Sequence, residues 1–298
     1  MMTTERAGGY FRGPERKRHN PLRWFALLPA LAVGGVFWLH WQCWGVTVTC
    51  TEGSLPGLPG EFDGYKIVHL SDLHGHEYGE GSADLLARVR EQKPDLIVVT
   101  GDLIDRESQM QMVPALAKGL AAIAPAYYVT GNHEWELGTA KVKELKNLLA
   151  RCGVTVLSNQ YEILERNGAQ IVLAGVDDPN GYADQTTPEE LYARIEGEAP
   201  GLFTVLLAHR NNRFDRYAAA GYGFVMSGHA HGGIVRLPFV GGLVGADRQF
   251  FPDWTSGLYT LGDSTLFVSR GLGNNTVPFR GFRIFNRPEL AVLTLRAV

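Results

Sequence analysis

The sequence has few cysteines and no excess of basic residues. Three cysteines, Cys43, Cys50 and Cys152, are too few for a framework of disulfide bridges, and their spacing matches no metal site. The net charge of −3 argues against nucleic acid as a partner, because such partners require a basic surface. Internal repeats and low-complexity tracts are also absent. With 298 residues, 45% of them hydrophobic and 20% charged, the composition is that of an ordinary globular protein with a sizeable core.

The N-terminal part of the sequence differs from the rest. A basic segment, residues 1–23, precedes an apolar stretch, residues 24–46, that just reaches the roughly 20 residues needed to span a bilayer core. Tryptophans lie near both ends of this stretch, as in interfacial aromatic belts: Trp24, Trp38, Trp41 and Trp44. We predict a single-span membrane anchor whose basic flank is cytoplasmic and whose following domain is extracytoplasmic. A cleaved signal peptide is the alternative, although no A-x-A site follows the stretch.

The remainder of the chain reads as a linker and one α/β domain. Residues 47–62 contain several glycines and prolines, which indicate a linker, and the domain is expected over residues 63–298. Strands alternate with helices as far as Cys152, which favours parallel βαβ units. Short strands are more frequent afterwards, with the last ones expected at Thr265–Ser269, Phe282–Phe285 and Leu290–Leu295. We therefore predict two sheets packed face to face with helices outside, a four-layer α/β/β/α sandwich.

Seven side chains of metal-ligand type each follow an apolar run that is typical of a strand. They are Asp72, His74, Asp102, Asn132, His209, His229 and His231. Asp72, Asp102 and Asn132 are spaced 30 residues apart, about the length of one βαβ unit. Parallel strands would bring these side chains to one sheet edge, where open α/β sheets place their ligand sites.

The donor set indicates two metal ions. One tetrahedral zinc ion takes four ligands, so seven donors suit a pair of ions that share a bridging carboxylate. Imidazole, carboxylate and amide ligands together suit Mn, Fe or Zn. A water held between two such cations becomes a nucleophile near neutral pH, and the pair stabilises in-line displacement at phosphorus. His133, next to Asn132, is then the natural general acid for the leaving alkoxide.

Each of these residues has a simpler interpretation when taken alone. A single Asp after a strand is usually a turn residue or a helix N-cap. A single histidine such as His209 is more often a partly buried, hydrogen-bonded residue. The ordered set of strand ends is what favours the metal site.

The same segments resemble the calcineurin-like metallophosphoesterase superfamily. Its blocks D-x-H, G-D-x-x-D-R, G-N-H-[DE], a lone His after a strand and G-H-x-H stand in order at residues 72–74, 101–106, 131–134, 209 and 228–231. The tail from Ser227 to Leu295 looks like the membrane-associated or exported bacterial phosphodiesterase-like branch. The resemblance implies that His133 is the acid and that two ions have these ligands: Asp72, His74, Asp102 and His231 for one, and Asp102, Asn132, His209 and His229 for the other.

Several residues near the predicted ligands have other possible roles. Glu134 stands where many relatives have Asp, and it could orient His133. Arg210 follows His209 close to where relatives often carry a proline, which could alter the substrate side of the pocket. We expect His69 to be a core residue, and we expect Asp105 to pair with its neighbour Arg106 or to cap the next helix. Asp177 and Asp178 read as part of a turn.

These observations favour a membrane-anchored, metal-dependent phosphoesterase. Its substrate is a phosphomonoester or phosphodiester, and the anchor favours a lipid or a cell-envelope compound. The resemblance also admits a UDP-sugar-lipid pyrophosphate as substrate. A metal-stabilised binding or scaffold protein on the same fold is the non-enzyme alternative, but such a protein would not need His133 as a proton donor.

Overall fold

The computed structural model describes residues 22–233, 235–245, 249–273 and 283–298, with side chains from residue 28 onward. The chain divides into two units, Met1–Trp38 and Leu39–Val298. Helix α1 (Leu22–Trp44) begins in the first unit and ends in the second. Among the described residues, no helix combines the length and the hydropathy that crossing a membrane requires. The anchor over residues 24–46 stays a prediction, and most of the basic segment 1–23 lies outside the described residues.

The first sheet joins the two ends of the domain. Its strand order is β1-β14-β2-β3-β4-β5. Neighbouring strands are parallel except for β14 and β2, which are antiparallel. The strands are β1 (Thr47–Leu55), β2 (Lys66–Leu70), β3 (Leu96–Thr100), β4 (Ala126–Val129), β5 (Thr155–Val156) and β14 (Glu289–Ala297).

The second sheet has a parallel centre and antiparallel edges. Its order is β12-β13-β9-β8-β7-β6, and only the outermost pairs, β12 with β13 and β6 with β7, are antiparallel. The strands are β6 (Gln160–Arg166), β7 (Ala169–Gly175), β8 (Thr204–Arg210), β9 (Phe224–Gly228), β12 (Gly257–Leu261) and β13 (Ser264–Val268). A separate hairpin consists of β10 (Arg236–Leu237) and β11 (Gly241–Gly242).

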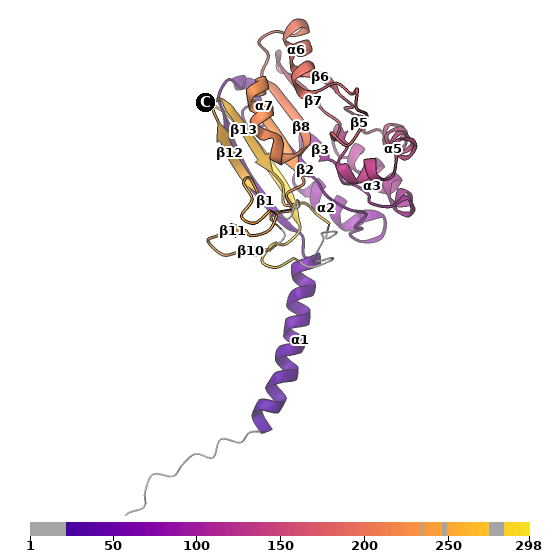
Figure 1. The fold of residues 1–298 in the computed structure, drawn as a ribbon, viewed down its shortest axis with the longest axis vertical. Helices are drawn as coiled ribbons and strands as arrows, with labels where there is room; N and C mark the ends of the chain where they lie inside the picture. The colour runs from indigo at the N-terminus through magenta and orange to yellow at the C-terminus, as the bar shows by residue number, and fades with distance from the viewer. Residues whose placement is uncertain (1–21, 234, 246–248, 274–282) are drawn as a thin grey trace, which may run out of the picture. The chain divides into compact units, whose positions relative to one another are not determined.

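Helices cover the outer face of each sheet (Figure 1). The first sheet packs on α2 (Ala83–Glu91), α3 (Val113–Ala121) and α5 (Thr139–Arg151), and the second on α6 (Pro188–Glu198) and α7 (Phe214–Ala220). Each helix packs on its sheet through an apolar face. In helix α3, for example, the buried residues fall about one helical turn apart and form such a face. The shorter helices are η1 (Gly60–Phe62), η2 (Glu80–Ser82), η3 (Glu107–Met112), α4 (Asn132–Glu136) and η4 (Asn211–Arg213).

The sheets themselves pack face to face. Val98 and Val129 of the first sheet meet Leu207 and Met226 of the second in one buried cluster. Together with the two helical clusters this gives the predicted α/β/β/α order of layers. All three clusters lie within Leu39–Val298, so this unit contains a complete core.

The linker predicted over residues 47–62 is wrong for most of its length. Residues Thr47–Leu55 form β1, which pairs with β14 in continuous parallel register from Thr47↔Glu289 to Leu55↔Ala297. Phe62, near the end of the expected linker, is fully buried between the sheets. The partner strand lies more than 200 residues away in sequence, so local composition could not indicate the pairing. Of the strand expected at Phe282–Phe285, Phe282 lies outside the described residues, and Ile284 forms a single bridge to Val235.

Candidate metal centre

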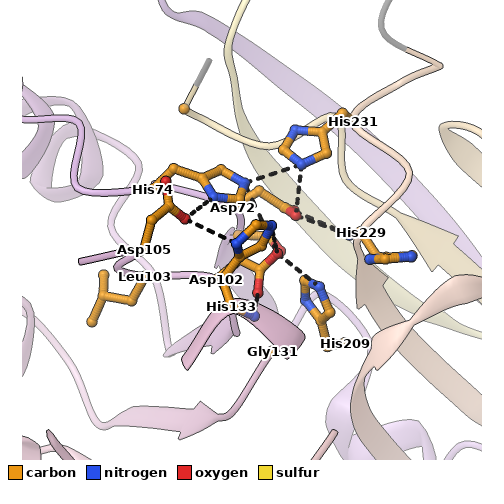
Figure 2. Close-up of polar contacts among 12 residues, drawn as sticks. Asp72, His74, Asp102, Leu103, Asp105, Gly131, His133, His209, His229 and His231 are labelled. Atoms are coloured by element: carbon orange, nitrogen blue, oxygen red, sulfur yellow. Dashed lines mark hydrogen bonds and ion pairs between the residues drawn. The ribbon is translucent and has the colours of Figure 1, made fainter. Parts of the chain in front are cut away.

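All seven predicted ligands are buried where strands of both sheets end. Asp72 and His74 follow β2, Asp102 follows β3, and Asn132 begins α4 directly after β4. The second sheet contributes the other three, from the end of β8 and the loop after β9: His209, His229 and His231. Figure 2 shows the labelled members of this set converging from the two sheets. The sequence therefore predicted their common location correctly, whereas metal ligation itself stays a prediction.

The carboxylate of Asp102 lies between two groups of donors. Its Oδ2 is 3.1 Å from Nε2 of His209 and 3.9 Å from Nε2 of His74. The donor atoms of each group lie within 4.8 Å of one another: Asp72, His74, Asp102 and His231 in one, and Asp102, His209 and His229 in the other. A carboxylate shared by two groups is what a bridging ligand requires.

Two further observations test whether these residues fit metal ions. Nε2 of His74 and Nε2 of His231 face each other at 3.0 Å, so both imidazoles direct a nitrogen into the same space. Oδ1 of Asn132 is buried and has no hydrogen-bond partner among the described residues. A buried polar atom without a partner is costly, by about 1–3 kcal/mol. Cations in this space would satisfy these atoms, and the donor set fits two of them.

The electrostatics of the cluster favour bound positive charge. Burial alone would raise the pKa of Asp102, but the neighbouring histidines, His209 first, hold it well below its usual range. Burial likewise opposes the charged form of His209, yet Asp102 beside it raises the pKa of that imidazole to about 10. A proton on His209 thus compensates the buried carboxylate. Metal ions would displace that proton, because imidazole binds metals in its neutral form.

The backbone is strained at most of the predicted ligands. Positive φ angles of 49–64° occur at five of them: Asp72, His74, Asp102, His229 and His231. The left-handed region costs residues other than glycine of order 1 kcal/mol or more, and such strain concentrates at functional sites. Glycines allow the loops to approach this closely. A Cβ at Gly228 would lie 2.3 Å from Asp72 Oδ2, and one at Gly131 would lie 2.2 Å from Asp102 Oδ1.

Comparison with known proteins identifies the family. The model of the calcineurin-like phosphoesterase family matches residues 65–233. The chain belongs to this family. It is 34% identical over 249 residues to the uncharacterized metallophosphoesterase YkuE of Bacillus subtilis. The alignment covers 80% of this chain and 82% of YkuE.

Two other relatives extend the comparison. The chain is 31% identical to the phosphodiesterase YaeI of Escherichia coli, with 78% of this chain and 82% of the relative covered. It is also 32% identical to a bovine transmembrane protein with a metallophosphoesterase domain, over 92% of this chain and 64% of the relative. This calcineurin-like phosphoesterase is thus a metal-dependent phosphoester hydrolase.

Two predicted ligands of the phosphoesterase have fixed ring orientations. Nδ1 of His74 lies 2.6 Å from Oδ1 of Asp105, and Nδ1 of His209 lies 2.7 Å from the carbonyl oxygen of Thr100. Both acceptors hold the proton on Nδ1 and leave Nε2 directed into the site. Asp105 was expected to pair with Arg106 or to cap a helix, and its contact with His74 was not predicted. The aspartate ends the G-D-x-x-D block, but its partner is in another loop.

Glu134 has a different role from the one expected. Its fully buried carboxylate does not contact His133. It accepts backbone N–H groups of Gly131 at 2.8 Å, Asp102 at 3.1 Å and Leu103 at 2.5 Å, and so ties the loop after β3 to the loop after β4. Burial, with Asp102 nearby, raises the pKa of Glu134 to about 7, although these N–H groups favour its ionised form.

His133 lies at the accessible side of the phosphoesterase site. Its side chain is 28% exposed, in contrast to the buried ligands. Nδ1 of His133 lies 3.5 Å from Oδ1 of Asp105 and 3.4 Å from Oε2 of Glu136. Nε2 lies 4.0 Å from Oδ2 of Asp102. The ring thus presents Nδ1 to carboxylates and Nε2 to the cluster.

A partly buried ion pair brings Arg210 to the same site. Nε of Arg210 donates to Asp178 Oδ2 at 2.7 Å, and its Nη2 donates to Oδ1 at 3.3 Å. Nη1 of Arg210 lies 3.3 Å from Nε2 of His229. Asp178 also forms the expected turn: its Oδ1 accepts the N–H of Asn180 at 2.9 Å, and its carbonyl oxygen accepts the N–H of Gly181 at 2.9 Å. The pairing with Arg210 is additional, and nothing local in the sequence indicated it. His69 is a core residue as expected: it is fully buried, with Nε2 2.7 Å from Thr100 Oγ1.

Proposed function

We propose that this phosphoesterase is attached to a membrane and hydrolyses a phosphodiester or phosphomonoester carried by a lipid or another cell-envelope compound. The observation that carries the hydrolytic part is the pair of donor groups sharing Asp102, with His133 at their accessible side. A scaffold protein would need the donors but not the exposed histidine.

The predicted ligands would hold two ions of Mn, Fe or Zn. One ion would have Asp72, His74, Asp102 and His231 as ligands, and the other Asp102, Asn132, His209 and His229. When bound, such a pair lowers the pKa of a water and stabilises the charge that develops on the phosphoryl group. Asp105 and the carbonyl of Thr100 keep two of the imidazoles turned toward the ions.

His133 would protonate the leaving oxygen of the ester. Asp105 and Glu136 lie within reach of its Nδ1, so they can accept that N–H and orient the ring. Nε2 is then left to donate a proton on the side of the cluster. Partial exposure of the ring leaves room for a substrate group beside it.

Membrane attachment is supported by the sequence and by the relatives. The basic residues 1–23 and the apolar stretch 24–46 have the order of a cytoplasmic flank and a span. The bovine relative, described as a transmembrane protein, aligns over most of this chain. The lipid or envelope substrate rests on this attachment, because the anchor would keep the site near the bilayer.

The hydrolytic part is tested by turnover of bis-p-nitrophenyl phosphate with the purified full chain and added Mn²⁺. Metal-dependent turnover that a chelator abolishes supports the enzyme. Bound metal without turnover, for both diester and monoester substrates, supports the scaffold alternative. Membrane attachment is tested separately by carbonate extraction of membranes that contain the full chain. Release of the protein into the soluble fraction would contradict the anchor.

A further inference from the structure

Large apolar side chains are exposed together around the β10–β11 hairpin. Six of them form what we call the hairpin patch: Leu237, Phe239, Val240, Phe250, Phe251 and Phe285. Phe239 at the hairpin tip is fully exposed, and Phe250 and Phe251 are 74% and 67% exposed. Figure 1 shows β10 and β11 projecting from the domain at the end opposite α6. Clustered exposed apolar side chains mark a contact with another molecule or with a membrane.

The hairpin patch is held by backbone pairing. Leu237 pairs with Gly241 across the hairpin, and Leu243 N donates to Val235 O at 2.8 Å. Phe251 N in turn donates to Leu243 O at 2.9 Å. Phe239 has a φ of 68°, which is unfavourable for a bulky residue, and its exposed ring gains no compensating burial within the domain. The fold therefore presents this ring outward at a cost.

The patch adjoins the last residues of the predicted anchor. Phe285 is two residues from Arg287, whose guanidinium lies 4.0 Å from the centre of the Trp41 ring. Nε of Arg287 also donates to Gly45 O at 2.8 Å. Trp41 and Trp44 are each about half exposed. Tryptophan and phenylalanine at such positions are typical of the headgroup region of a bilayer.

We propose that the hairpin patch, beside Trp41 and Trp44 at the end of the predicted anchor, is a second membrane contact that lies in the headgroup region of a lipid bilayer. This inference rests on the proposed membrane attachment and deepens it. A lipid bilayer suits the patch better than a protein partner does, because the apolar stretch 24–46 leads into the domain next to the patch.

Trp44 and Asn286, the residue after Phe285, each contact a loop that carries a predicted metal ligand. The rings of Trp44 and His76 lie 4.0 Å apart, and His76 is two residues from His74. Nδ2 of Asn286, next to Phe285, donates to the carbonyl oxygen of His231 at 2.7 Å. The membrane contact would thus hold the metal centre beside the headgroups. The substrate class of the metal centre is then a phosphoester that remains in the bilayer during hydrolysis.

The test places an environment-sensitive dye on the patch of the full chain. Cys50 is exposed, whereas Cys43 and Cys152 are buried, so Cys50→Ser provides a background with no reactive surface thiol. The dye is attached in that background through Phe239→Cys or, as a matched control, through Leu261→Cys. Leu261 is exposed near Phe203 and Gly223, where β8 and β9 begin, at the opposite edge of the sheet from the metal centre.

The labelled proteins are reconstituted into phosphatidylglycerol and phosphatidylethanolamine vesicles with and without a lipid-borne quencher. We expect blue-shifted emission and quenching at position 239 only, and only with vesicles. Emission at 239 that remains that of a water-exposed dye in vesicles would overturn the inference. So would an equal blue shift without vesicles, which would mean that a second copy covers the patch.

Turnover of bis-p-nitrophenyl phosphate by the same labelled proteins separates the inference from the proposed function and checks that they are folded. Turnover without quenching at position 239, in protein that carbonate does not extract from the vesicles, rejects only the membrane contact. Quenching at position 239 with no turnover by the metal-loaded wild type rejects only the hydrolase.

Discussion

The carboxylate of Asp105 lies 2.6 Å from Nδ1 of His74, and this contact fixes which nitrogen of the imidazole faces the metal centre. The same carboxylate oxygen is 3.5 Å from Nδ1 of His133 (Figure 2). Asp105 therefore links a predicted ligand to the predicted acid without being either.

Asp105→Asn should weaken metal binding while the fold is retained. The amide accepts a weaker hydrogen bond from His74 and can present its NH₂ group instead, so the imidazole loses its fixed orientation. Replacing such supporting groups costs roughly 10–100-fold in metal affinity. Titration of the metal-free protein with Mn²⁺ measures this, with Asp63→Asn on the far side of the domain as control. Equal affinities of Asp105→Asn and wild type would show that His74 is oriented by other groups.

His133→Asn should keep the metals and lose turnover by roughly 10²–10⁴-fold, the usual size of a general-acid contribution. The loss should be largest for alkyl esters, whose alkoxide leaving groups need a proton. It should shrink for p-nitrophenyl esters, whose leaving group departs readily as the anion. Comparison of kcat for the two ester classes checks this, together with metal content. Equal losses in both classes would mean that His133 positions the phosphate and does not protonate the leaving oxygen.

Arg210→Lys should raise KM for the phosphoester by about tenfold and change kcat less. Asp178 holds the guanidinium through two hydrogen bonds and directs Nη1 toward His229, a geometry that an ammonium group cannot reproduce. Steady-state kinetics of this variant are compared with those of Arg216→Lys as a control. Arg216 forms an ion pair with Glu189 on the protein surface. A fall in metal content of Arg210→Lys would show instead that Arg210 supports His229.

His69 should make the protein less stable in acid. Burial lowers the pKa of His69 to about 3, whereas the unfolded chain protonates it below about 6.5. Between these values the unfolded state binds more protons, so the free energy of unfolding falls as the pH falls from 6.5 toward 3. His69→Gln removes this contribution.

The difference between the two proteins is the measurable quantity. Relative to His69→Gln, the wild type should lose about 1.4 kcal/mol per pH unit below pH 6. Urea denaturation at pH 7, 6 and 5 gives this difference. Parallel pH dependences of the two proteins would show that His69 is protonated in the folded state.

The sequence predicted the centre of the site better than its surroundings. Each ligand follows an apolar run, and parallel strands have a common edge, so Asp72 and Asp102 could be placed together without coordinates. The prediction missed β1 and β12, one outer strand of each sheet, because both strands contain glycine and are only partly apolar. In addition, β1 pairs with a segment at the far end of the chain. Such pairing leaves no local pattern.

The supporting residues were missed for a related reason. Local interpretation placed Asp105 with Arg106 or at a helix cap, Glu134 with His133, and Asp178 in a turn, and the turn at Asp178 is confirmed. In the folded protein each carboxylate also binds a group from a distant segment, over 31 or 32 residues for the contacts with His74, Asp102 and Arg210. Such contacts depend on how the loops meet above the sheet edge, which a single sequence does not encode in its spacing.

The metal content of the purified protein tests the central claim most directly. We predict about two transition-metal ions per chain in the wild type, measured by mass spectrometry of the dialysed full chain. Asp102→Ala should lose most of both ions, because its carboxylate lies in both donor groups. Asp63→Ala, on an exposed turn, should lose neither. One ion per chain in the wild type, or undiminished metal in Asp102→Ala, would contradict the two-metal site.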